Sequence, residues 1–304
     1  MIYEYAIDPQ LIHNWAQNKR DRREFVQSFG IGQPRIMAGF PKFHKWRSLV
    51  LRSIPASFTD NDKKIVEELV NAIGEVTVRR NRNIYDGSTD WLDNIRTENA
   101  ATPFNNVFLK SRPTPPLGNE FEQADIYSKP TKYWDFPSQV LANRTASELA
   151  DAVSNMLRLA TRIIFIDPYI RNTSDKLNPL AAYINRAINN RVSDTSPDIE
   201  VIFDGNSSGA PTSEYLYNAI ISNIGDSINH VSLTVKELGQ NIGGEKLHNR
   251  YILTDLGGCS FGVGLDEGSG SESDEITLLS KEVYDLRWRQ YVKGNEFNQI
   301  SLFP

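Results

Sequence analysis

Residues 245–266 spell EKLHNRYILTDLGGCSFGVGLD, two apolar runs separated by the dipeptide Gly257-Gly258. Apolar and polar side chains alternate over 246–255, which predicts a half-buried β-strand. A Gly-Gly pair is a hairpin turn signal, so residues 259–264 are predicted to form the returning strand. The stretch therefore predicts a β-hairpin in which the first strand carries most of the polar chemistry.

The first strand of this hairpin places four side chains on one face, because successive residues of a strand point to opposite sides. These side chains are His248, Arg250, Ile252 and Thr254. An imidazole can act as nucleophile, acid or base near neutral pH. A guanidinium binds phosphate or carboxylate oxygens in a fork. The pair predicts an anion site; the alternative is a solvated face with structural hydrogen bonds.

The spacing His248-x-Arg250, four residues, then Asp255 resembles the H-x-K-x4-D motif of the phospholipase D superfamily, which G-S-x-N follows. Here Arg250 replaces the lysine, and residues 262–265 read GVGL, without the serine and asparagine. Glu275, beside Asp274, lies about where many members carry a further acidic residue. The resemblance implies catalytic roles for His248, Arg250, Asp255 and Glu275.

The run HNRYILTD-GG-FGVGLD is also similar to the non-enzymatic, phospholipase D-like C-terminal domain of MIT-domain proteins. That resemblance implies binding of a phospholipid head group. It covers about residues 145–292 and implies a mixed sheet with the motif strand at its centre.

The composition is that of a globular protein: 304 residues, 39% hydrophobic, 23% charged and a net charge of −5. The chain has no apolar run long enough for a transmembrane helix and no signal-peptide pattern at its start. A single cysteine, Cys259, excludes an intramolecular disulfide and favours a cytoplasmic location. One cysteine and four scattered histidines match no zinc spacing, so neither a metal nor a cofactor is expected.

The first 58 residues are locally basic, with nine Lys and Arg against four Asp and Glu. Basic residues alternate with Phe43 and Trp46 in the stretch 40–52, a pattern that can hold phosphates and stack bases. The alternative is a charged surface whose aromatic side chains point into the core. The candidate nucleic-acid-binding residues are Arg22, Arg23, Lys45, Arg47, Arg79, Arg80 and Arg82.

The order of elements predicts an α/β protein with two domains. Residues 1–111 are predicted to form a smaller N-terminal α/β domain. Residues 112–144 are predicted to form a connection that is rich in proline and aromatic residues and has no regular period. Residues 145–304 are predicted to form a phospholipase D-like mixed sheet flanked by helices. In the last region, buried strands over 162–166 and 199–203 end at Asp167 and Asp204. Both carboxylates would lie at the edge where open α/β sheets bind ligands.

Three functions follow as hypotheses. A phospholipase D-like phosphodiesterase needs two histidines, so a chain with one motif implies a homodimer that pairs His248 with its symmetry mate, as in metal-independent nucleases. A degenerate module would bind phosphate-bearing ligands, such as nucleic acid or a phospholipid head group, or a partner protein. A structural component of a multi-protein system, as in prokaryotic antiviral defence, is the third hypothesis.

Overall fold

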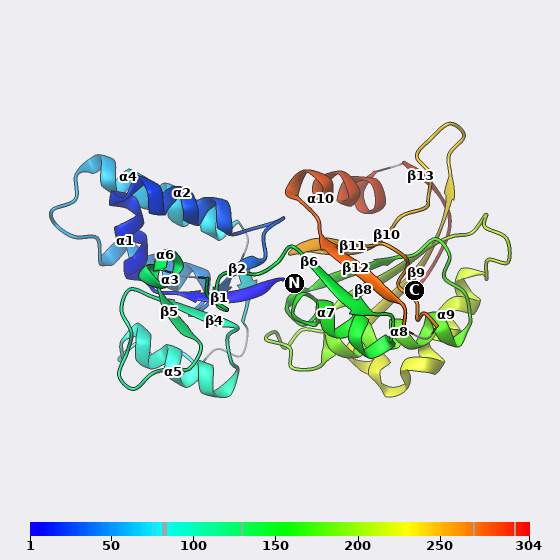
Figure 1. Cartoon of the computed structure of the whole chain (residues 1–304), viewed down its shortest axis with the longest axis horizontal. Helices are drawn as coiled ribbons and strands as arrows, with labels where there is room; N and C mark the ends of the chain where they lie inside the picture. Colours follow the sequence, from blue (N-terminus) through cyan, green and yellow to red (C-terminus); the bar gives the residue numbers. More distant parts are fainter. Residues whose placement is uncertain (76, 81–83, 129, 270, 295) are drawn as a thin grey trace. The chain divides into compact units, whose positions relative to one another are not determined.

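The computed structural model describes residues 1–75, 77–80, 84–128, 130–269, 271–294 and 296–304, and these form a mixed α/β protein of two compact units. One unit comprises residues 2–137 with 192–194, and the other comprises residue 1, residues 138–191 and residues 195–304 (Figure 1). No helix among the described residues is both long enough and apolar enough to cross a membrane.

The N-terminal unit is built on a five-stranded sheet in the order β3-β2-β1-β4-β5, and all of its neighbouring strands are parallel. Its strands are β1 Tyr3–Ile7, β2 Arg35–Gly39, β3 Thr77–Arg79, β4 Asn106–Leu109 and β5 Glu120–Glu122. Its helices are α1 Pro9–Gln17, α2 Lys19–Ser28, α3 Phe43–Arg52, α4 Asp60–Gly74, α5 Trp91–Ala101 and α6 Gln123–Ser128.

Helices cover both faces of this sheet, because its strands are apolar on both sides as parallel strands require. On β1, Tyr5 and Ile7 belong to the core under α1–α4, whereas Ala6 belongs to the smaller core that α5 covers with Ile95. The 15-residue helix α4 begins with a capping box, in which the side chain of Thr59 and that of Asp62 each bond the other's backbone.

Residues 112–144 were predicted to form a connection without regular secondary structure, and this prediction was wrong. It contains β5 and α6, and its last part forms β6, Gln139–Asn143, in the sheet of the C-terminal unit. Strand β5 has three residues and buries only Phe121, so no alternation is long enough to be detected. Trp134 packs in the main core of the N-terminal unit beneath the Arg35 guanidinium, 4.1 Å from the ring centroid.

Arg80 is a structural residue and not part of a basic surface, which corrects its assignment as a nucleic-acid contact. Its side chain is fully buried, with Nη1 2.6 Å from Glu4 Oε2 and Nε 3.0 Å from Glu98 Oε1. The guanidinium also lies 4.0 Å from the centroid of the Phe104 ring. The buried guanidinium is paired with both carboxylates, so removing it leaves two buried negative charges without a partner.

We therefore expect Arg80→Ala to lower the free energy of unfolding of the N-terminal unit by about 3–5 kcal/mol. Arg79→Ala is the matched control, because Arg79 is exposed and a surface change there costs within about 0.5 kcal/mol. Urea unfolding followed by circular dichroism measures both. Equal midpoints for the two variants would show that the ion triad contributes nothing to stability.

The C-terminal unit holds an eight-stranded mixed sheet in the order β13-β9-β8-β7-β10-β11-β12-β6. Strands β7, β8 and β9 are parallel, and the remaining neighbours are antiparallel. Besides β6, the strands are β7 Arg162–Ile166, β8 Asp198–Asp204, β9 Ser232–Gln240, β10 Arg250–Thr254, β11 Gly257–Phe261, β12 Ser273–Leu278 and β13 Phe297–Phe303. Its helices are α7 Ala146–Leu159, α8 Ser174–Ile188, α9 Ser213–Ile224 and α10 Lys281–Trp288, with the short turns η1 Gly225–His230 and η2 Arg289–Lys293.

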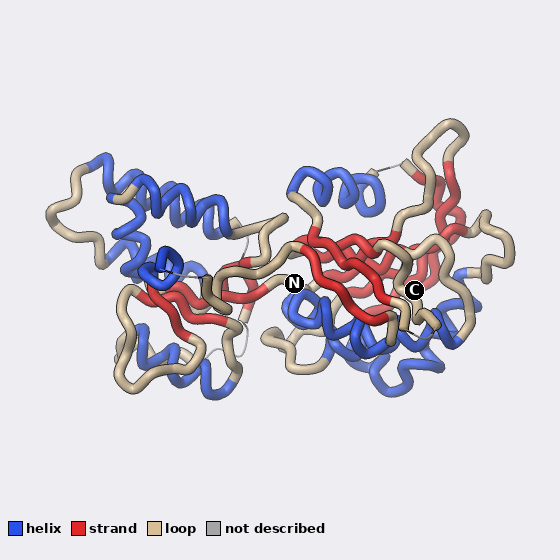
Figure 2. Tube along the Cα trace, in the orientation of Figure 1, coloured by secondary structure: helices blue, strands red, loops and turns tan. Residues whose placement is uncertain are grey.

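The helices of this unit lie in two layers (Figure 2): α7, α8 and α9 cover one face of the sheet, and α10 with η2 lies on the other. Alternation along each strand assigns its side chains to these layers. Phe165 of β7 stacks on Tyr183 of α8, and Tyr251 of β10 contacts Tyr291 of η2. Residues at odd-numbered positions of β10, such as Tyr251, therefore face η2. Residues at even-numbered positions, such as Arg250, face the α8 side.

Strand β10 lies inside the sheet, but it is shorter than the predicted strand 246–255. It starts at Arg250, so His248 precedes the strand by two residues and is not part of it. β10 starts at Arg250 because both of its neighbours end there. The pairing of β7 ends at Ile166, opposite Tyr251, and that of β11 ends at Phe261, opposite Arg250. Backbone before Arg250 has no strand to pair with on either side.

Candidate anion-binding site

Tyr169 joins the two residues of the predicted anion site. It follows β7 in the sequence Asp167-Pro168-Tyr169, and its hydroxyl lies 2.8 Å from His248 Nδ1. The Arg250 guanidinium carbon lies 4.7 Å from the centroid of the same ring, a cation–π distance. The structure thus brings His248 and Arg250 together around one tyrosine.

The two cationic side chains differ in their surroundings. His248 is exposed, and its Nε2 has no hydrogen bond among the described residues. Arg250 is half-buried, and its Nε is a buried donor that no described residue accepts from. Because the Nε is shielded from solvent, a bound anion would contact the remainder of this half-buried guanidinium.

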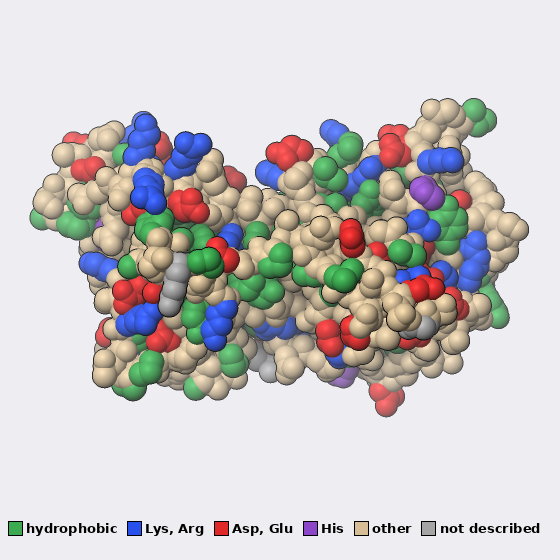
Figure 3. All heavy atoms as spheres, viewed as in Figure 1, with side chains coloured by type: hydrophobic (Ala, Val, Ile, Leu, Met, Phe, Trp, Pro, Cys, Tyr) green, Lys and Arg blue, Asp and Glu red, His purple; other side chains and the backbone are tan. Residues whose placement is uncertain are grey.

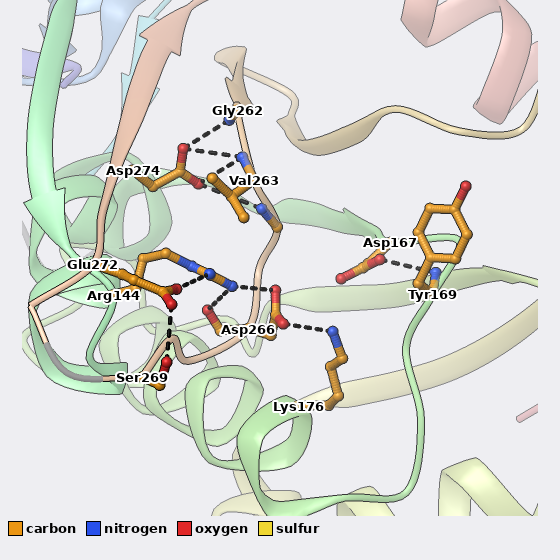
Figure 4. Close-up of polar contacts among 11 residues, drawn as sticks. Arg144, Asp167, Tyr169, Lys176, Gly262, Val263, Asp266, Ser269, Glu272 and Asp274 are labelled. Atoms are coloured by element: carbon orange, nitrogen blue, oxygen red, sulfur yellow. Dashed lines mark hydrogen bonds and ion pairs between the residues drawn. The ribbon is translucent and has the colours of Figure 1, made fainter.

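Asp167 precedes Tyr169 by two residues and is 3% exposed. Its Oδ1 accepts a hydrogen bond of 2.9 Å from the backbone N–H of Tyr169 and so fixes the turn that presents the tyrosine (Figure 4). Burial raises the pKa of Asp167, an effect that this hydrogen bond and the positive charges of Lys176 and Arg250 oppose. A cavity of about 10 Å³ lies between Asp167, Lys176 and Asp266.

Asp266 is the centre of an ion network that holds the loop after β11. Its two oxygens lie 2.6 Å from Lys176 Nζ and 3.0 Å from Arg144 Nη2, and Arg144 also binds Glu272 at 2.7 Å (Figure 4). Burial alone would raise the pKa of Asp266, but the hydrogen bond and charge of Lys176 together with Arg144 lower it. The negative charge of Asp266 is therefore balanced within the protein.

Asp255, for which the resemblance implies a catalytic role, does not share a pocket with Arg250, as expected for residues five positions apart on one strand. Its carboxylate accepts hydrogen bonds from the backbone N–H and hydroxyl of Thr161, at 3.0 and 2.6 Å, and from the N–H of Arg162 at 3.3 Å. Asp255 thus ties the start of β7 to the end of β10. Arg250 is at the opposite end of β10, about five strand residues or roughly 16 Å away.

Glu275 is also outside the site. It is exposed on β12, where its carboxylate accepts a hydrogen bond of 2.9 Å from the amide of Gln139. Its neighbour Asp274 is buried and accepts from the backbone N–H groups of Gly262, Val263 and Gly264. Asp274, and not Glu275, therefore shapes the turn that follows β11.

The remaining basic candidates lie on separate elements of the N-terminal unit. Arg22 and Arg23 are on α2, Lys45 and Arg47 on α3, and Arg79 at the end of β3, while Arg82 lies outside the described residues. All of the five described are exposed except Arg22, which is half-buried and bonds the carbonyl of Ala16 at 3.1 Å. On the face in Figure 3, Lys and Arg side chains gather over α2 and α4.

The aromatic residues between these basic positions face inward. Trp46 is fully buried and donates from Nε1 to the carbonyl of Ile7 at 2.8 Å, and Phe43 packs against the same core. They are not available to stack on bases, which agrees with the alternative of a charged surface whose aromatic side chains point into the core. A contact with polyanions on α3 would depend on charge alone.

Sequence reasoning assigned no role to Tyr169, Lys176 or Asp266. The signal for Tyr169 was its place two residues after a buried strand that ends in Asp167, at the ligand-binding edge of an α/β sheet. Lys176 and Asp266 are 90 residues apart and carry no local pattern. Among the described residues, no group of three His, Cys, Asp or Glu is arranged to hold a metal ion.

We expect Asp167→Asn to stabilise the C-terminal unit at neutral pH, because the amide keeps the acceptor for Tyr169 and carries no buried charge. Burial raises the pKa of Asp167 in the folded state. The stability that the protonated carboxyl contributes to the folded state is therefore fully present below the unfolded pKa of about 3.9, and it is lost as the pH rises through the folded pKa. From pH 4 upward, the melting temperature of the variant should change less with pH than that of the wild type. Each kcal/mol of stability that the variant gains should raise its melting temperature by about 2–4 °C. Parallel curves for the two proteins would contradict this.

No family model and no curated protein matches the chain. Among solved structures, it is similar to TrmBL2, described as an archaeal chromatin protein with a novel mode of DNA binding, at 11% identity and a TM-score of 0.30. The similarity covers 56% of this chain and 55% of that one, so the chain spans about half of this relative's length. At this TM-score the similarity carries no argument about fold or function.

Proposed function

We propose that the C-terminal unit is a phospholipase D-like module that binds the phosphate group of a phosphate ester at His248 and Arg250. The observation that carries the proposal is the arrangement of both side chains around Tyr169, with the Nδ1 of His248 bonded to its hydroxyl. Two donors that converge from a half-buried and an exposed position suit one ligand with several oxygens.

The direction of the hydrogen bond between Tyr169 and His248 separates binding from catalysis. A hydroxyl can donate to an imidazole nitrogen or accept from its N–H, and the binding function corresponds to the arrangement O–H···Nδ1. The proton of the neutral ring then sits on Nε2, which points away from the tyrosine and can donate to a phosphate oxygen. In this tautomer Nε2 has no lone pair with which to attack phosphorus.

The turn after β11 supports the same reading. Phospholipase D-like catalysis is implied to use a serine and an asparagine where this chain has Val263 and Leu265. The backbone N–H of Val263 is bonded to Asp274, and Leu265 is buried. This turn therefore supplies no second set of donors to a transition state.

We expect Arg250→Ala to weaken binding of a short single-stranded oligonucleotide, or of vesicles with an anionic phospholipid, by about tenfold to a hundredfold, because a charge-assisted hydrogen bond contributes about 1.5–3 kcal/mol. Arg250→Lys should recover part of the loss, since it keeps the charge but not the fork. Arg289→Ala is the charge-matched control, because Arg289 is exposed on η2, on the other layer. Fluorescence anisotropy and vesicle sedimentation separate the two ligands. Equal losses in the Arg250 and Arg289 variants would refute the site.

A second candidate is a phosphodiesterase that works as a homodimer, with nucleic acid as substrate in a setting such as antiviral defence. The exposed Nε2 of His248 favours it, because a symmetry mate can approach that nitrogen. Catalysis requires the other tautomer, in which Nδ1 donates to the Tyr169 hydroxyl.

Tyr169→Phe tests the hydrogen bond that both candidates share, and a cleavage assay distinguishes the candidates. We expect the substitution to reduce anion binding by about twofold to tenfold, since the ring of His248 loses the hydrogen bond that fixes it. The wild type should bind without cleaving DNA, RNA or a model phosphodiester. Cleavage that His248→Ala abolishes, and that falls on dilution, would instead establish the homodimeric enzyme.

A further inference from the structure

A groove of about 550 Å³ lies between α8 and α9, in the helical layer that Arg250 faces. Its α9 side is one stripe of that helix, formed by positions 215, 218, 219, 222 and 223. At the rise of an α-helix, this stripe extends over roughly 12 Å. The volume lies in the range of about 300–1,000 Å³ that is typical of small-molecule sites, so the groove is large enough for an organic ring system.

The lining of this groove is uncharged, and its amide side chains are its most exposed part. Leu177 of α8 is buried and Ala219 of α9 is half-buried, whereas Asn178 and Asn218 are exposed. A side-chain amide can both donate and accept hydrogen bonds. The groove therefore suits a flat, neutral group that has apolar faces and polar edges.

Tyr215 provides an aromatic ring at one end of the groove. Its side chain is 58% exposed, and the side chain of Asn172 donates from Nδ2 to its hydroxyl at 2.9 Å. This hydrogen bond fixes a ring that is otherwise open to solvent. An exposed aromatic ring of this kind is a surface on which a nucleobase can stack.

The segment 169–172 connects this ring to the proposed phosphate site. Tyr169 contacts His248 and Arg250, and Asn172 contacts Tyr215. Three residues span at most about 11 Å between Cα atoms. The cationic pair and the exposed ring therefore lie within reach of one extended ligand, which would carry an anionic group and a neutral aromatic group.

We propose that the phosphate ester bound by the C-terminal unit is single-stranded nucleic acid, with a phosphate at His248 and Arg250 and a nucleobase stacked on Tyr215. This inference rests on the proposed function and names its ligand class. Unpaired bases offer their faces to aromatic side chains and their edges to amides, whereas a duplex keeps its bases stacked inside. A phospholipid head group supplies the phosphate but no aromatic ring for Tyr215.

Fluorescence anisotropy at one fixed salt concentration tests the proposal with labelled oligo-dT and with an abasic strand of the same length. We expect Tyr215→Ala to weaken binding of oligo-dT by about fivefold to a hundredfold and to leave binding of the abasic strand unchanged, because the variant removes only base stacking. Tyr215→Phe is the matched control. It should retain most of the affinity, since it keeps the ring and loses only the hydrogen bond from Asn172.

Ala219→Leu tests the groove without changing Tyr215. Ala219 is half-buried in the lining, so a larger side chain narrows the groove. We expect this variant to weaken binding of oligo-dT by about threefold or more, again without an effect on the abasic strand. Thermal unfolding of the free proteins shows whether each variant is folded. Sedimentation with vesicles of an anionic phospholipid measures the competing source of phosphate.

Arg250→Ala separates this inference from the proposed function. If Arg250→Ala weakens binding of both strands while Tyr215→Ala and Ala219→Leu change neither, the phosphate site stands and the nucleobase groove is refuted. The groove is refuted equally if oligo-dT and the abasic strand bind the wild type with the same affinity, or if only the vesicles bind. If Arg250→Ala affects neither strand, the proposed function fails and this inference fails with it.

Discussion

The antiparallel pairing of β10 with β7 is the constraint on which the candidate site depends. Because Tyr251 pairs with Ile166, the start of β10 and the end of β7 meet at one edge of the sheet. Arg250 begins one strand, and Asp167 and Tyr169 follow the other. The parallel pairing of β7 with β8 makes the same edge the carboxyl end of the parallel strands, where α/β sheets bind ligands. The register of β10 against β7 therefore brings Arg250 to the same edge of the sheet as Asp167 and Tyr169.

Local sequence predicted the elements of this region well, because apolar alternation and continuous apolar runs report burial directly. The hairpin, the buried strands and the face on which Arg250 lies follow from such patterns. The position of the hairpin turn does not, because Gly257 and Gly258 belong to β11 and the turn lies at residues 255–256. The position of His248 does not, since the start of β10 is set by the ends of β7 and β11, which are distant in sequence. Tyr169 is identified only when β7 and β10 are known to be neighbours.

Charged residues were the least predictable, because charge in a sequence does not reveal burial. Arg79 and Arg80 are adjacent, yet one is exposed and the other is enclosed by Glu4 and Glu98, which are 76 and 18 residues away from it. Asp255 fits a catalytic spacing and in fact caps the backbone at the start of β7. In both cases the partners come from distant elements, so spacing along the chain could not show them.

The two layers of the C-terminal unit give its sheet two chemically different faces. On the α8 side, Arg250 is half-buried and an exposed histidine lies beside it, so this side suits an anion. On the η2 side, Lys236 and Arg162 share the carboxylate of Glu200, and the aromatic rings of Tyr251, Tyr291 and Phe297 pack together. Because alternate residues of a strand point to opposite faces, a change at Arg250 does not alter the side chains near Lys236. Each face can therefore be tested by substitutions that leave the side chains of the other face unchanged.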